Sequence, residues 1–283
     1  MIRVYVMFLL IYATRSQPNI IFIMGDDLGY GDLGYTGNIH HQTPNIDMLA
    51  SRGVFFTDYY AGASVCTPSR GSTLTGKYFS KLGLYPGVLD PYDIGGLNML
   101  HHTYVRRLRE AGYSTALVGK WHLGIHATYH PFNHGFQHYY GIPFSHDECT
   151  SKIHWNGAAS GIYGPCPLFE GCNIAIQRNF SMITVDDLYL SKVKEHIAAL
   201  REPYYIHVTP YHTHLPYYPL NSVKSSVEAL DKFVGHIVGS IGNNTIVIFT
   251  SDNGAPYWFS GSNNDPYRCA KGSTWEGDGT SPL

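Results

Sequence analysis

Charged side chains are scarce in this chain, and the two signs nearly cancel. Lysine, arginine, aspartate and glutamate make up 14% of its 283 residues, and the formal net charge is −2. Without a basic excess there is no electrostatic footprint for nucleic acid, and the chain has no acidic tail. The apolar content of 44% is that of a globular protein. A chain of this length buries a large core and forms one big domain or most of one.

Long apolar runs are also missing. No stretch approaches the roughly 20 apolar residues of a membrane helix, so no membrane span is predicted. The N-terminus reads MIRVYVMFLLIYATRSQ, in which Arg3 precedes an apolar segment over residues 4–13 and small or polar residues follow. This pattern predicts a signal peptide over residues 1–16, leaving residues 17–283 as the folded part. A buried first strand or a short anchor is the alternative.

Cysteine is present in an odd number, so at least one thiol is free, modified or without its partner. Sequons at Asn179 and Asn243 agree with the secretory pathway, where disulfides form. Three of the cysteines lie in a polar, glycine-rich stretch where disulfides would cross-link a loop. The five are Cys66, Cys149, Cys166, Cys172 and Cys269.

Apolar strand-like runs alternate with helical patterns along the chain. Strands are expected at residues 19–24, 54–60, 113–118, 203–209 and 245–250. Helices are expected at residues 44–52, 104–110, 184–200 and 225–239. The third of these is expected to begin with a capping box formed by Thr184 and Asp187. Residues 120–180 read as a long insertion. This alternation predicts an α/β fold with a mainly parallel sheet flanked by helices on both faces.

Polar residues follow the first and last of these strands. Asp26 and Asp27 come after the first, and Asp252 and Asn253 come after the last. Either pair alone is more often a turn or a cap. In open α/β sheets, however, sites form at the carboxyl ends of strands. Together these side chains offer an all-oxygen site suited to Ca²⁺ or Mg²⁺ and unsuited to zinc.

A cysteine opens the segment CTPSRGSTLTGK at residues 66–77. Thr67, Pro68 and Ser69 are typical of a first helical turn, so Cys66 is expected at a helix N-terminus, close to unpaired N–H groups. Arg70 follows one turn later. A helix N-terminus stabilises negative charge, so a cysteine at this position indicates chemistry that involves an anion.

Candidate cations and proton carriers lie near the other strand ends. Lys120 and His122 alternate around Trp121, and His212 and His214 alternate in PYHTHLP, so that each pair can face one side. Lys271 lies in RCAKGSTWEG near the end of the chain. Each of these residues alone is more often a solvated surface residue. Together with the carboxylates and Cys66, they describe a pocket for a charged oxyanion ester bound to a divalent cation.

The string CTPSR followed by LTGK resembles the sulfatase signature Cys-x-Pro-x-Arg followed by Leu-Thr-Gly-Arg, with Lys77 replacing the last arginine. The segments NIIFIMGDDLGYGDLGYTG, GKWHLG and IVIFTSDNG are also similar to that family. LYPGVLDPYDIGGL, GIPFSHD, HTHLP and RCAKGSTWEG resemble the arylsulfatase A type most, and the galactosamine-6-sulfatases next. The resemblance covers residues 19 to about 277. It implies the alkaline-phosphatase-like α/β fold and hydrolysis of sulfate esters, such as a sulfated galactolipid or sulfated sugar, in the lysosome.

The resemblance also implies cofactors. The formylglycine-generating enzyme would convert Cys66 during secretion, and the hydrated aldehyde would be the nucleophile. Calcium would be bound by residue 66 and by Asp26, Asp27, Asp252 and Asn253. Phosphatases and phosphodiesterases of the same superfamily use zinc and lack the Cys-x-Pro-x-Arg segment. The presence of that segment here disfavours a phosphatase or phosphodiesterase function.

Roles for the remaining site residues follow from the same resemblance. Arg70 would hold residue 66 and the metal site in place, and Lys120 and Lys271 would neutralise sulfate oxygens. His214, rather than His212, would protonate the leaving oxygen, and His122 would act as the base that regenerates the aldehyde. Ser145 would lie beside the substrate. A Cys149–Cys172 disulfide is implied in the same way.

The chain also departs from the family pattern. EGDGTSPL stands where the family has its usual Glu-Gly-Gly segment. By the same resemblance, the smaller C-terminal domain of the family would be missing, and the stretch at residues 219–244 would be shorter than its counterpart in the family. Cys269 would then be left unpaired. These departures keep open a second hypothesis, a catalytically inactive, truncated sulfatase-like protein with a binding role or none. The natural substrate and the oligomeric state stay open.

Overall fold

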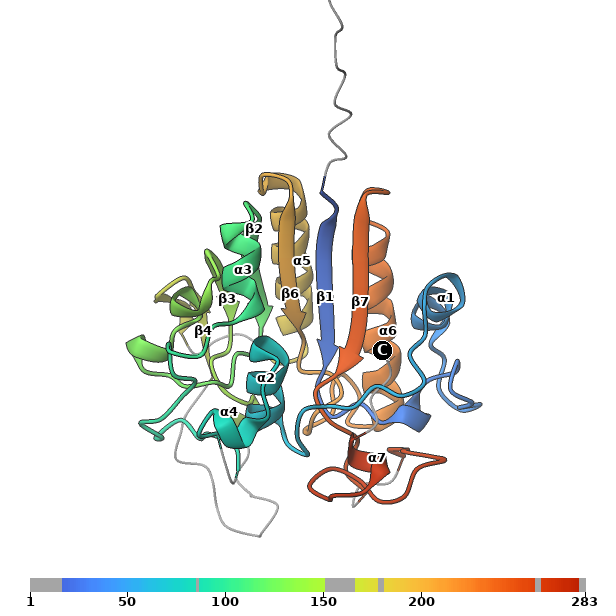
Figure 1. Ribbon diagram of the computed structural model, residues 1–283. Helices are drawn as coiled ribbons and strands as arrows, with labels where there is room; N and C mark the ends of the chain where they lie inside the picture. The colour runs from blue at the N-terminus through green and yellow to red at the C-terminus, as the bar shows by residue number, and fades with distance from the viewer. Residues whose placement is uncertain (1–16, 85–86, 151–165, 178–180, 258–260, 280–283) are drawn as a thin grey trace, which may run out of the picture.

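The computed structural model describes residues 17–84, 87–150, 166–177, 181–257 and 261–279 (Figure 1). One seven-stranded sheet, in the order β5-β4-β3-β2-β6-β1-β7, forms its centre. The strands are β1 (Asn19–Gly25), β2 (Ser114–Gly119), β3 (His138–Gly141), β4 (Pro167–Glu170), β5 (Asn173–Gln177), β6 (Tyr204–Thr209) and β7 (Thr245–Ser251). The helices are α1 (Pro44–Arg52), α2 (Cys66–Thr75), α3 (Tyr104–Glu110), α4 (Asp147–Thr150), α5 (Val185–Ala199), α6 (Val223–Val238) and α7 (Glu276–Gly279).

The five strands from β3 to β7 in the sheet order run parallel, which confirms the expected mainly parallel sheet. β4 and β5 complete one edge in antiparallel pairing. β1 lies between β6 and β7, and its sequence NIIFIMG is buried at every position but one. A continuous apolar run of this kind is typical of a strand covered on both faces.

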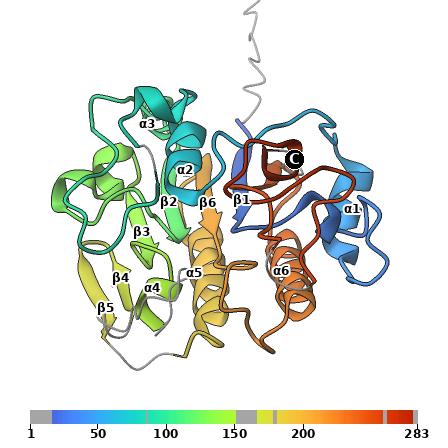
Figure 2. The same cartoon turned by 90° about the horizontal axis from the view of Figure 1, so that it is seen from below.

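Alternate residues of β1 contribute to two separate cores. Ile21 and Ile23 pack into the core that includes residues of α5 and α6, whereas Phe22 and Met24 pack into the core that includes residues of α2 and α3. Figure 2 shows these two pairs of helices on opposite sides of the sheet. The side-chain period of two along the strand supplies both faces, and helices on both faces are confirmed.

The parallel strands bring their carboxyl ends to one edge of the sheet, at the lower side of Figure 1. α4 and α7 lie at the same edge. The residues that follow β1, β2, β6 and β7 therefore converge there, although they are far apart in the sequence.

Residues 54–60 do not form the predicted strand. They contain a turn at Thr57 and Asp58 and a single bridge at Tyr60. The side chains of Val54 and Phe56 are 77% and 54% exposed, so these strand-favouring residues find no neighbouring layer to cover them.

Two further predictions need correction. Helix α5 begins as expected after Thr184, but the capping box does not form, because the Thr184 hydroxyl donates to the Ser181 carbonyl at 2.9 Å and makes no cap. Residues 120–180, which were expected to be a long insertion, belong in part to the central sheet. That stretch supplies β3, α4, β4 and β5, and so builds one side of the sheet.

The cysteines pair differently from the Cys149–Cys172 prediction, which is wrong because Cys172 is a free, exposed thiol at the turn between β4 and β5. Cys166 is in a disulfide. Cys269 is free and exposed, as expected. The predicted signal peptide and the sequon at Asn179 lie outside the described residues. Within them, no helix is both long and apolar enough to cross a bilayer.

Candidate active site

Cys66 is the first residue of α2, as the sequence predicted. Val65 before it is extended, so the helix begins abruptly at the cysteine. Its Sγ lies 3.4 Å from Asp26 Oδ1 and 3.8 Å from Lys271 Nζ. The thiol therefore lies between a carboxylate and an ammonium group at the positive end of a helix.

The Cys66 thiol is 1% exposed, and its burial raises its pKa well above the usual value. Lys120 and Lys271 act in the opposite direction, but Asp26 and Asp252 add to the upward shift. The unmodified side chain is consequently a protonated thiol and a poor nucleophile.

The acidic residues after β1 and β7 lie side by side because the two strands pair up to Gly25 and Ser251. Asp252 Oδ1 accepts the N–H of Asp27 at 3.1 Å, and Asn253 Nδ2 donates to Asp27 Oδ1 at 2.8 Å. Asn253 Oδ1 is buried and finds no hydrogen-bond partner in the described part of the chain. A buried amide oxygen without a donor is an available ligand for a cation.

Arg70 joins these two strand ends. Its Nε donates to Asp252 Oδ2 at 2.9 Å, and its Nη2 lies 2.7 Å from the same oxygen and 3.5 Å from Asp26 Oδ1. Nη1 donates to the Lys120 carbonyl at 3.2 Å. Burial opposes the charge, but Asp252 and Asp26 outweigh it and raise the pKa of Arg70. The guanidinium thus fixes both carboxylates and stays charged.

Two lysines each pair with one of the adjacent aspartates. Lys120 Nζ lies 2.7 Å from Asp26 Oδ2 and donates to Ser145 Oγ at 3.2 Å, while Lys271 Nζ contacts Asp27. Burial would lower the pKa of each lysine, but the neighbouring carboxylates raise it. Both ammonium groups therefore stay charged where a bound anion would need them.

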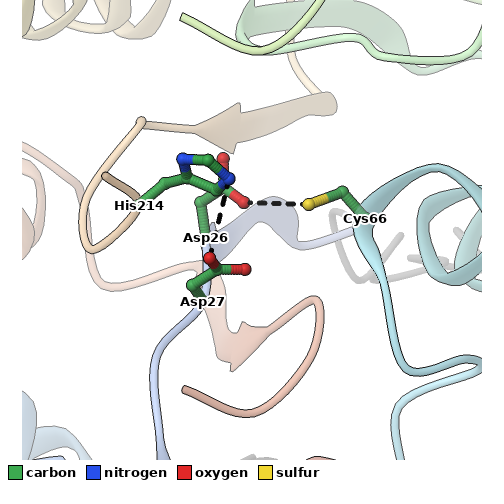
Figure 3. Close-up of side chains that lie close together, drawn as sticks. All are labelled: Asp26, Asp27, Cys66 and His214. Atoms are coloured by element: carbon green, nitrogen blue, oxygen red, sulfur yellow. Dashed lines mark hydrogen bonds and ion pairs between the residues drawn. The ribbon is translucent and has the colours of Figure 1, made fainter. Parts of the chain in front are cut away.

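His214 projects toward the same cluster (Figure 3). Its Nδ1–H donates to the Leu215 carbonyl at 2.7 Å, and its Nε2 lies 3.3 Å from Lys271 Nζ and 3.6 Å from Asp27 Oδ2. His212 does not share this side, contrary to the expectation from their alternation. Its ring contacts Asp186 and Ser226 instead, because the chain turns between the two histidines.

His122 lies behind the first turn of α2, where the Thr67 hydroxyl donates to its carbonyl at 2.9 Å. Its Nε2–H donates to the Leu89 carbonyl at 2.9 Å, and its buried Nδ1 has no partner among the described residues. Burial, followed by the charges of Lys120 and Arg70, holds the pKa of His122 well below its ordinary value. The ring is therefore neutral, with a free lone pair on Nδ1.

Asp26, Asp27, Cys66 and His214 bring one ligand atom each within 4.8 Å of one another. Figure 3 shows their side chains converging. Asp252 lies outside this set of four but contacts it through Asp27 and through Arg70. The carboxylates together with the free oxygen of Asn253 form a donor set rich in oxygen, which fits calcium better than a soft metal.

Sequence reasoning missed two acidic residues next to Ser145. Asp147 Oδ1 lies 3.9 Å from His214 Nδ1, and Glu148 Oε2 accepts the N–H of Ser145 at 2.9 Å. Burial raises the pKa of Glu148 to about 8. The only signal in the sequence was their position directly after GIPFSH, which does not reveal that the loop folds against His214.

Comparisons with known proteins indicate the family of the chain. Residues 18–283 match the Sulfatase family model. The chain is 35% identical over 300 residues to arylsulfatase A of Bos taurus, covering 96% of this chain and 59% of that protein. It is 31% identical to N-acetylgalactosamine-6-sulfatase of Sus scrofa, covering 96% and 57%. The chain thus spans less than two thirds of the length of these relatives.

Solved structures give the same result. The crystal structure of PsFucS1 sulfatase from Pseudoalteromonas sp. is similar with a TM-score of 0.81 at 27% identity, covering 94% of this chain and 61% of that one. The structure of Ps i-CgsB in complex with k-i-k-neocarrahexaose has a TM-score of 0.80, also at 27% identity, covering 94% and 65%. The sheet, with its helices on both faces, is the alkaline-phosphatase-like fold of these enzymes. A family match over nearly all of the described chain, on the fold of solved sulfatases, shows that this chain belongs to the sulfatase family.

Proposed function

We propose that this chain hydrolyses sulfate esters with a formylglycine made from Cys66 and with bound calcium. One observation carries the proposal. Cys66 lies at a helix N-terminus, between the Asp26 carboxylate and the Lys271 ammonium. A thiol held protonated there has no evident use, whereas a hydrated aldehyde at this position would be a nucleophile next to groups that bind an anion.

Calcium would be held by Asp26, Asp27, Asp252 and Asn253 together with residue 66. When bound, it supplies positive charge that lowers the pKa of a nearby hydroxyl and stabilises negative charge on sulfate oxygens. The charge balance of the site supports this assignment. Three carboxylates and three cations are already paired, so a divalent cation adds the charge that an incoming sulfate ester and an alkoxide would neutralise.

The other side chains bind the sulfate group or transfer protons. Lys120 and Lys271 neutralise sulfate oxygens, and Ser145, held by Lys120, lies beside the ester. His214 presents Nε2 to the site because its Nδ1–H is occupied by the Leu215 carbonyl, and in its protonated form it gives the Nε2 proton to the leaving oxygen. His122 accepts a proton at Nδ1 in the step that restores the nucleophile.

The substrate we propose is a sulfated sugar, free or as the headgroup of a galactolipid. The name N-acetylgalactosamine-6-sulfatase and the carbohydrate complex of Ps i-CgsB support a sugar ester. We also propose passage through the secretory pathway to the lysosome. The disulfide at Cys166 and the exposed sequon at Asn243 support that route, since both fit an oxidising compartment where glycans are added.

The test measures sulfate release from 4-nitrophenyl sulfate and from a galactose 3-sulfate. The protein is secreted from cells that convert the signature cysteine to formylglycine. A Cys66→Ser variant and a calcium-chelated sample serve as controls, and mass spectrometry of the tryptic peptide reports conversion. Release that needs both residue 66 and calcium would support the proposal. A soluble, converted chain with no release above the variant would support the inactive alternative.

A further inference from the structure

Behind the active site, His212 is the centre of a buried hydrogen-bonded unit. Its Nε2 pairs with Asp186 Oδ2 at the start of α5, and its Nδ1 lies 2.9 Å from Ser226 Oγ on α6. The His212 and Ser226 side chains have no solvent exposure. The residue types are those of a Ser-His-Asp relay, but a substrate cannot reach Ser226, so this unit is not a second catalytic centre.

The backbone of the same segment holds Asp26. The N–H of Asp26 donates to the His212 carbonyl at 2.7 Å, and the N–H of Thr213 donates to the Asp26 carbonyl at 2.6 Å. Asp26 is thereby held from both of its peptide groups. The side chain so placed contacts Cys66, Arg70 and Lys120.

His214 follows two residues later on the same turn. Its N–H donates to the Tyr211 carbonyl at 2.9 Å, which closes the turn. The Tyr211 hydroxyl donates to the Met182 carbonyl at 2.7 Å and anchors the turn again, just before α5. One anchored turn therefore determines where both Asp26 and His214 lie.

We propose that Asp186, His212 and Ser226 form a positioning unit that holds Asp26 and His214 in place, and so sets calcium affinity and turnover. A buried ring with partners on two helices has one orientation, because any rotation would leave polar atoms unpaired. A displacement of about 1 Å at a reacting group costs roughly 100-fold in rate. The expected effects on calcium affinity and turnover rest on the proposed function. The link between the His212 unit and the position of Asp26 does not depend on it.

The first experiment measures amide hydrogen exchange at Asp26 and Thr213, compared between the wild type, Asp186→Asn and Asp187→Asn. Asp187 is the matched control, because it carries the same charge on the next residue of α5 and its side chain is exposed. We expect exchange at both amides to be at least tenfold faster in Asp186→Asn and unchanged in Asp187→Asn. Equal protection in the two variants would overturn the proposal. If Asp186→Asn does not fold, Ser226→Ala, which removes a single hydroxyl, replaces it.

The second experiment measures calcium affinity by calorimetry and the kcat and KM for a sulfate ester. We expect Asp186→Asn to lower kcat about tenfold or more and to weaken calcium binding, with KM changed less than threefold. A lower melting temperature with unchanged kcat and calcium affinity would show a merely structural role and overturn the proposal. The exchange measurement requires neither calcium nor substrate. A wild type without activity therefore counts against the proposed function, while the exchange result still decides whether the unit holds Asp26.

Discussion

The Lys271 ammonium lies 2.7 Å from both carboxylate oxygens of Asp27, although 244 residues separate the two. The segment after β7 thus returns to the end of β1 and supplies a counter-ion to one of the proposed calcium ligands. Because Lys271 also approaches His214 Nε2 and Cys66 Sγ, this one ammonium contacts the candidate metal ligand, acid and nucleophile.

Lys271→Gln should therefore affect stability in a calcium-dependent way. Removing the ammonium leaves the buried Asp27 charge uncompensated, which costs about 3 kcal/mol when a buried pair loses one partner. Calcium should replace much of that compensation. Thermal melting with calcium and with chelator should show a larger calcium-induced rise in Tm for the variant than for the wild type. Lys192→Gln, a control at a lysine paired with exposed glutamates, should show the wild-type response, and an equal response in Lys271→Gln would contradict the assignment.

Arg70→Lys should destabilise the site despite keeping the charge. One ammonium cannot make the contacts to Asp252, Asp26 and the Lys120 carbonyl that the guanidinium makes together. We expect a loss of about 2 to 4 kcal/mol in the free energy of unfolding and weaker calcium binding. Urea denaturation and calorimetry measure the two effects. Arg107→Lys at an exposed ion pair should change stability by less than about 0.5 kcal/mol.

His214→Gln should slow poor leaving groups more than good ones. Nitrophenolate departs without a proton, whereas a sugar alkoxide needs one, and glutamine cannot supply it. We expect kcat to fall by about 10²- to 10⁴-fold on a sugar sulfate and by less than tenfold on 4-nitrophenyl sulfate. Steady-state kinetics on both esters decide the matter. The same loss on both substrates would mean that His214 does not act as the acid.

Glu148 should make the protein less stable as the pH rises. Its pKa of about 8 in the folded protein exceeds the ordinary value of 4.5, so the folded state favours the protonated form. This contribution to stability is fully present below about pH 4.5 and is lost as the pH rises through about 8.

Glu148→Gln keeps the acceptor for the Ser145 N–H but cannot ionise. Relative to the wild type, the variant should gain about 4 kcal/mol of stability between pH 5 and pH 9, because each unit of pKa difference is worth about 1.4 kcal/mol. Chemical denaturation at several pH values measures the difference. In the control Glu110→Gln, at an exposed ion pair, the free energy of unfolding should depend on pH as it does in the wild type. The same pH dependence in Glu148→Gln would rule out a buried, protonated Glu148.

Much of the fold followed from local patterns in the sequence. The apolar run NIIFIMG predicted a strand buried on both faces, and β1 is such a strand. Residues 104–110 form α3 with the predicted bounds. Residues 54–60 failed as a strand because strand propensity needs a covering layer, which that loop does not have. Whether a covering layer exists is decided by packing between distant segments.

The sequence by itself determined which chemical groups the site has. It placed acids directly after β1 and β7 and a cysteine at the start of α2, because strand ends and helix starts are set by neighbouring residues. Only the tertiary structure decided the partners. The turn between His212 and His214 directs one ring to α5 and α6 and the other to the site, and Cys172 stays free while Cys166 is bridged. These choices depend on contacts across long sequence separations, and no local pattern encodes them.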